Sequence, residues 1–71
     1  MKMKWTLTFP EGVQMDIESM QLNTLGFMTE TTGKTVIASL TWWEAINFRT
    51  PSGLNLAEFL KALQESGVTV E

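Results

Sequence analysis

The chain has 71 residues, with five lysine or arginine residues against eight aspartate or glutamate residues and neither histidine nor cysteine. This length predicts a single small domain over residues 1–71, and the missing residue types exclude a disulfide framework and the common zinc sites. Because the net charge is −3 and no basic cluster occurs, duplex nucleic acid is an unfavourable partner. No apolar run approaches the roughly 20 residues that a membrane span needs, so we expect no membrane as a partner. The absence of cysteine fits a reducing compartment, and we expect a cytoplasmic protein without a metal or a cofactor.

The first segment, residues 2–9, is predicted to be a half-buried strand. Its odd positions are apolar and its even positions are lysine or threonine, which gives a period of two. The turn-forming sequence 10–12 follows, and apolar residues alternate again over 13–17. These patterns predict an antiparallel hairpin in which Lys4 faces Glu18 on the polar side of the sheet.

The alternation is lost over residues 19–25, where we expect a bulge or a loop. Residues 26–30 and 35–40 then flank a polar segment that contains a glycine near its centre. This arrangement predicts a second hairpin, with its turn at Thr32 and Gly33.

Two interpretations of residues 41–49 are open. Apolar residues occupy most even positions from Val36 to Phe48, which favours one long strand that continues through this segment. Thr41 and Glu44, however, have the spacing of a capping box, which predicts a short helix. Of the two, we prefer the strand.

The C-terminal third contains the clearest helix signal. Asn55 and Glu58 have the spacing of a capping box, and apolar residues follow at i, i+3, i+4 and i+7. We predict a helix over about 56–66, ended by Gly67 in the left-handed conformation. Residues 68–70 alternate as a short closing strand, which we expect to run parallel to the strand before the helix.

Together these elements predict a small α+β domain. The sheet is expected to be mostly antiparallel, with two hairpins and elements in the order β-β-β-β-α-β. One helix is expected to pack on one face of this sheet. The chain shows no repeat or linker that would divide it into smaller units.

The sequence offers little for catalysis. Without histidine or cysteine, the remaining acid-base and nucleophilic groups are carboxylates, lysines and hydroxyls. Asp16 and Glu18 share one face of the predicted second strand, but exposed strand faces normally carry such residues. The glycines lack the spacing of a phosphate-binding loop. We therefore expect a protein that is not an enzyme.

The adjacent tryptophans Trp42 and Trp43 are the most informative feature of the sequence. On a strand, neighbouring side chains point to opposite faces, so Trp42 is expected in the core beside the helix and Trp43 on the outward face. If residues 41–49 form a helix instead, both side chains are expected to be partly buried. The outward face is expected either to be covered by residues 19–25 or to bind a partner. The predicted partner-binding residues are Trp43, Ile37, Met28, Met20 and Arg49.

The favoured function is a small protein–protein interaction module that self-associates as a homodimer or docks on another protein, since tryptophan, methionine and arginine are enriched in interfaces. An alternative is a protein that binds a small apolar ligand in a pocket lined by methionines and Trp42, between sheet and helix or between subunits. Stacking of single-stranded nucleic acid on Trp43, Phe48 and Arg49 is a further alternative, which the absence of a basic groove disfavours.

Overall fold

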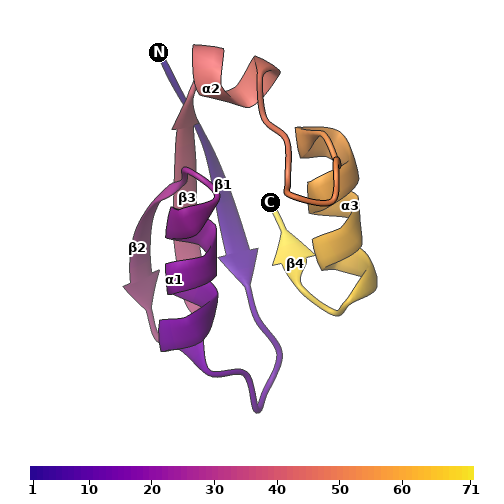
Figure 1. The fold of residues 1–71 in the computed structure, drawn as a ribbon. Coiled ribbons are helices and arrows are strands. Elements are labelled where there is room, and N and C mark those ends of the chain that lie inside the picture. Colours follow the sequence, from indigo (N-terminus) through magenta and orange to yellow (C-terminus); the bar gives the residue numbers. More distant parts are fainter.

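A computed structural model describes all of residues 1–71 and shows one four-stranded sheet with helices packed against it (Figure 1). The strand order is β2-β3-β1-β4, and each neighbouring pair is antiparallel. This confirms the predicted α+β class and the mostly antiparallel sheet. The elements in chain order are β1 (Lys2–Thr8), α1 (Met15–Thr24), β2 (Met28–Thr32), β3 (Thr35–Thr41), α2 (Trp42–Ile46), α3 (Leu56–Glu65) and β4 (Thr69–Val70).

The connections between the strands form two crossovers. α1 connects β1 to β2, and β3 lies between these two strands in the sheet. α2 and α3 connect β3 to β4, and β1 lies between these two strands. This split β-α-β connectivity is that of ferredoxin-like domains. Since β3 and β4 are both antiparallel to β1, they run in the same direction, as predicted for the closing strand, but β1 separates them.

α1 replaces the predicted second strand of the first hairpin, so the sequence-based interpretation is wrong for residues 13–17 and for the loop expected over 19–25. On the helix, Met15 and Leu22 are seven residues apart and both pack on the core. The polar Ser19 occupies the intervening position on this side of the helix. On this side of α1, apolar residues therefore do not recur at every helical turn.

The predicted cross-strand pair between Lys4 and Glu18 is absent as a result. Lys4 lies opposite Ser39 of β3. Glu18 is in the first turn of α1, where the positive end of the helix dipole favours a carboxylate. The only ion pair in the structure joins Lys34 and Glu11.

The hairpin of β2 and β3 is confirmed, with its turn one residue later than predicted. Thr32 pairs with Thr35, which leaves Gly33 and Lys34 as the two-residue turn. Gly33 has a φ of 59°, which glycine adopts without strain, whereas Lys34 has a negative φ. A positive φ at the first turn residue alone is typical of the type II′ turn, which matches the twist of paired strands.

β3 ends at Thr41, so the preferred interpretation of residues 41–49 as a strand is wrong and the alternative helix is confirmed as α2. The capping box of α2 is complete. The backbone N–H of Glu44 donates to the Thr41 hydroxyl at 3.1 Å, and the N–H of Thr41 donates to the Glu44 carboxylate at 2.8 Å. Trp42 and Ile46 fit the alternation of a strand, but they are also four residues apart and lie on one side of a helix.

α3 is confirmed with both of its predicted ends. Asn55 and Glu58 form the two reciprocal capping bonds, 2.9 and 3.0 Å long. Gly67 has a φ of 103°, and the N–H of Val68 donates to the carbonyl of Leu63 at 3.0 Å. This bond across the last turn is typical of the Schellman motif, which satisfies carbonyl groups that the helix leaves unpaired.

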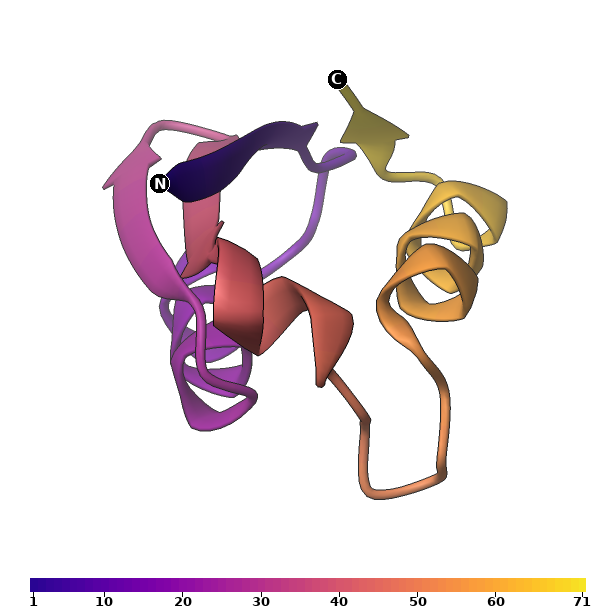
Figure 2. The same cartoon turned by 90° about the horizontal axis from the view of Figure 1, so that it is seen from above.

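The core lies between the sheet and the two longer helices, α1 and α3, which are on the same side of the sheet (Figure 2). Phe27 is at the centre of an aromatic cluster. Its ring centroid is 6.1 Å from that of Trp5, 5.5 Å from that of Phe48 and 6.0 Å from that of Phe59. Such contacts stabilise a core beyond the effect of buried area alone. The sheet contributes the buried side chains of Leu7, Val36, Ala38 and Leu40.

Candidate functional site

The face of the sheet turned away from α1 and α3, here called the open face, carries two of the five predicted partner-binding residues. Met28 of β2 is 61% exposed and Ile37 of β3 is 40% exposed. They border a shallow depression together with Lys2, Lys4 and polar residues of the central strands. α1 packs on the opposite face, so the expectation that residues 19–25 cover this one is wrong. The open face is mixed in character and carries no aromatic side chain.

Trp43 and Arg49 lie elsewhere, at the end of the molecule where α2 follows β3. They border a hollow of about 300 Å³, which is also lined by the buried Leu40 and Phe48 and by the exposed Glu44. Because Phe48 is only 5% exposed and belongs to the aromatic cluster, it is not available to stack on a nucleic-acid base.

Met20 lies on a third surface. It is on α1, is 60% exposed and borders an open groove of about 520 Å³ between α1, α3 and the loop over residues 50–54. The apolar lining of this groove includes Leu25, Leu54 and Phe59. The structure therefore brings the predicted residues together only as two pairs, one on the open face and one beside α2, and leaves Met20 apart from both.

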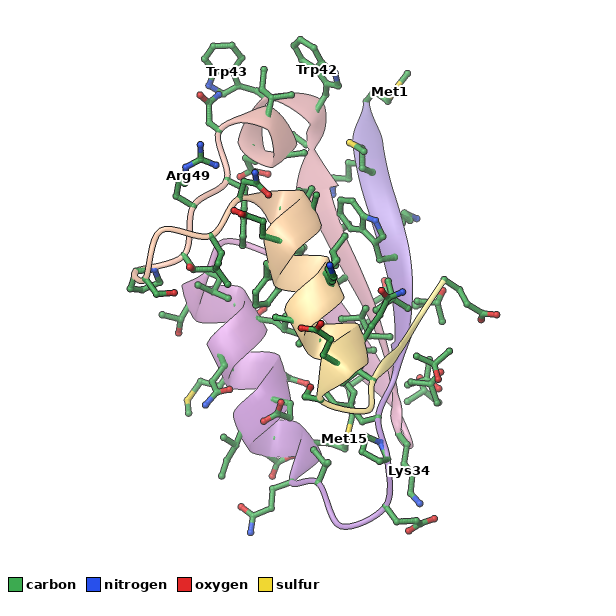
Figure 3. The ribbon with its side chains drawn as sticks, turned by 90° about the vertical axis from the view of Figure 1, so that its right-hand side faces the viewer. Met1, Met15, Lys34, Trp42, Trp43 and Arg49 are labelled. Atoms are coloured by element: carbon green, nitrogen blue, oxygen red, sulfur yellow. The ribbon has the colours of Figure 1, made fainter.

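Four exposed apolar residues, of which sequence analysis named only Trp43 as partner-binding, form what we call the tryptophan surface, defined as Met1, Trp42, Trp43 and Ile46. These side chains are 98%, 55%, 66% and 54% exposed, respectively. Both indole rings point away from the body of the protein at one end, next to Met1 (Figure 3). The backbone N–H of Trp42 donates to the carbonyl of Met1 at 3.0 Å, which ties α2 to the start of β1. The prediction that Trp42 enters the core is wrong.

The shortness of α2 explains why its tryptophans stay outside. Ala45 is its only buried residue, and Phe48, just beyond its end, continues the contact with the core. The helix therefore has one anchored side, and the rest of its surface is free. An aromatic side chain has roughly 150–250 Å² to bury, so at these exposures the two indoles together present roughly 200–300 Å². With Met1 and Ile46 added, the exposed apolar area falls within the roughly 300–600 Å² of the largest apolar patch on a typical monomer, and such patches are often functional.

Two oppositely charged residues border the same hollow as Trp43. They are Glu44, which follows Trp43 in the sequence, and Arg49. Neither residue forms an ion pair within the chain. Glu44 uses one carboxylate oxygen in the capping box, and the guanidinium of Arg49 donates only to the carbonyl of Phe48, at 3.2 Å. A carboxylate oxygen and several N–H donors therefore remain available to a partner.

No three or more aspartate, glutamate, histidine or cysteine side chains lie close enough together to hold a metal ion. None of the helices has the length and apolar character that a bilayer crossing requires.

Comparison with known proteins adds no relationship. No protein-family model, curated protein or solved structure matches the chain. Ferredoxin-like connectivity is shared by domains with many unrelated functions, so function is inferred from the surfaces described above.

Proposed function

We propose that the protein is a non-catalytic interaction module that forms a homodimer through the tryptophan surface. The observation that carries this proposal is that α2, only five residues long, exposes three large apolar side chains, Trp42, Trp43 and Ile46. Leaving such side chains in water forgoes the stabilisation that burial provides. Tryptophan is also among the residues that contribute most to the affinity of interfaces.

A second copy of the chain suits this surface because complementary features lie side by side on it. In a two-fold symmetric contact both copies present the same surface, so each feature and its complement must be present together. The exposed indole of Trp43 borders the hollow, and Glu44 and Arg49 supply opposite charges at its margin. An indole of one copy can thus enter the hollow of the other, while Arg49 approaches the partner copy's carboxylate.

The thin core supports the same proposal. Only 11 of the 71 residues are buried, and α3 has no buried residue. Small domains commonly gain stability from disulfides, metals or oligomerisation, and this chain has no cysteine. A cytoplasmic location belongs to the proposal, because a chain without cysteine gains nothing from an oxidising compartment.

The test compares Trp43→Ala with Ile37→Ala by sedimentation velocity over a dilution series. Both side chains are exposed and apolar, so neither change removes a core contact. Truncation of a hot-spot tryptophan costs about 2 kcal/mol or more, which is roughly 30-fold in Kd. We expect Trp43→Ala to shift the equilibrium to monomer and Ile37→Ala to behave as the unmodified chain. If only Ile37→Ala weakens association, the open face forms the contact and the proposal is wrong.

A second candidate function rests on the groove between α1 and α3. Its volume of about 520 Å³ and its apolar lining suit a small apolar ligand. A thermal-shift screen with medium-chain fatty acids and alcohols tests this candidate, with Met20→Gln as the variant that makes the groove polar. A ligand that raises Tm in the unmodified chain more than in Met20→Gln would support it, and no response from any compound rejects it.

A further inference from the structure

The first half of β1 has a free edge. β1 is seven residues long but β4 only two, and the register of β4 covers only Leu7 and Thr8. One further pairing follows, in which Thr6 and Glu71 exchange backbone hydrogen bonds of 2.9 and 3.0 Å. Residues 2–5 therefore have β3 on one side and no strand on the other (Figure 1).

The backbone groups of Lys2 and Lys4 point to this free edge. Successive residues of a strand direct their N–H and C=O groups to alternate sides. Thr6 directs both of its groups away from β3, to Glu71. Lys4 and Lys2 are two and four residues before Thr6, so they direct theirs to the same side. The edge thus offers the N–H and C=O groups of both lysines to an incoming strand.

On the open face, the edge is positively charged. The side chains of Lys2 and Lys4 are exposed, and neither forms an ion pair, although Glu30 of β2 borders the same depression and Glu71 directly follows β4. The ammonium of Lys2 donates to the sulfur of Met28 at 3.2 Å, and a thioether is a weak acceptor. A carboxylate from a partner would be a stronger acceptor for both ammonium groups.

On the helix side, the same edge is apolar and incompletely buried. Leu7, beside β4, is 1% exposed, whereas Trp5 is half-buried and Met3 is 38% exposed. Burial along β1 therefore falls off where β4 ends. A strand added beside residues 2–5 would cover Met3 and Trp5 as β4 covers Leu7.

We propose that the free edge of β1 binds an extended peptide segment in which apolar and acidic residues alternate. The segment adds as a strand antiparallel to β1, in line with β4. Its acidic residues lie opposite Lys2 and Lys4 and exchange backbone hydrogen bonds with them, and its apolar residues lie opposite Met3 and Trp5. This edge is a different surface from the tryptophan surface, so the inference does not depend on the proposed dimer.

The other edge of the sheet does not suit the same segment. Thr32 pairs with Thr35 beside the two-residue turn, so Thr32 and Glu30 direct their backbone groups to β3. The backbone groups of Thr29 and Thr31 therefore point outward, away from β3. Glu30 lies between them on the open face and repels an acidic strand. Their hydroxyls are already engaged by α1, at 2.9 Å from Asn23 and 2.6 Å from Ser19. The amides of Thr29 and Thr31 therefore serve as an internal control.

The test uses an alternating valine–glutamate peptide of about eight residues, which at ~3.4 Å per residue spans the edge with room at both ends. Amide hydrogen exchange of the full chain is followed by NMR. With the peptide at about ten times its Kd, we expect exchange at Lys2 and Lys4 to slow roughly tenfold, because the site is then empty about a tenth of the time. Exchange at Thr29 and Thr31 should stay unchanged.

Three control peptides and one variant separate the contribution of backbone pairing from that of charge. N-methylation of the glutamates removes the N–H groups that pair with β1 and should weaken binding at least about tenfold, whereas N-methylation of the valines should not. A valine–lysine peptide should bind weakly to the unmodified chain. It should bind well to the double variant Lys2→Glu, Lys4→Glu, in which both changed side chains are exposed. No slowing at Lys2 and Lys4, equal effects of the two N-methylation patterns, or equal binding of the two charge types would each overturn the proposal.

Discussion

The cap of α2 links local structure to association, and the chain contains a matched control for it. Thr41→Ala removes the hydroxyl that accepts the N–H of Glu44 at 3.1 Å. Asn55→Ala removes the corresponding acceptor at the start of α3, where the bond to Glu58 is 2.9 Å long. Both residues begin a complete capping box, so the two variants lose the same kind of bond from helices of five and ten residues.

We expect each substitution to lower the free energy of unfolding by about 1 kcal/mol, the typical effect of losing a side-chain N-cap. For a domain of this size, that loss corresponds to roughly 4–8 °C in Tm. The effects on dimerisation should differ, because a five-residue helix is marginal without its cap and Trp42 and Trp43 depend on it for their positions. Since both copies lose the cap, Thr41→Ala should weaken the free energy of dimerisation by up to about 2 kcal/mol. This loss raises Kd roughly 30-fold.

Two measurements on the same samples separate these effects. Urea unfolding followed by far-UV circular dichroism, at the lowest usable concentration, reports the stability of the single chain. Sedimentation velocity over a dilution series reports Kd. If Thr41→Ala and Asn55→Ala change Kd equally, or if Thr41→Ala changes neither quantity, the reasoning that α2 positions the contact is refuted.

Two further variants test the fold. Gly67→Ala should lower the free energy of unfolding by about 1–2 kcal/mol, because a φ of 103° is unfavourable for a residue with a Cβ, even though the added atom meets only Pro10 Cγ at 3.8 Å. An unchanged urea midpoint would contradict this. Phe27→Ala should cost about 3–5 kcal/mol, because Phe27 contacts three other aromatic rings in the core. That loss is comparable to the whole stability of a small domain, so a native near-UV circular dichroism spectrum would show that Phe27 is not central.

The elements that the sequence predicted correctly are those with strong local signals. Asn55 and Glu58 define the start of α3, Gly67 defines its end, and Gly33 defines a hairpin turn, because each acts through backbone groups within a few residues. The order of the strands has no such local signal. Pairing of β1 with both β3 and β4 depends on contacts between residues that are far apart in the sequence.

α1 and α2 were misread for physical reasons that can be stated. In α1, Ser19 occupies a position on the core side of the helix, so the apolar period is interrupted and the alternation over 13–17 prevails. In α2, Trp42 and Ile46 satisfy both a strand and a helix, and the capping box was the decisive signal. The choice between strand and helix also decided the candidate site. Trp43 and Arg49 border one hollow, but they do not lie on the sheet beside Ile37 as the strand interpretation predicted.

The solution mass of the unmodified chain tests the central claim most directly. Light scattering over a dilution series, from high to low micromolar protein, reports the number of chains in each particle. The proposed two-fold contact requires a mass that rises from one chain to two and then stops, because neither copy keeps an unused tryptophan surface. A mass of one chain at every concentration, or growth beyond two chains, would contradict the proposal that this surface joins two copies of the protein.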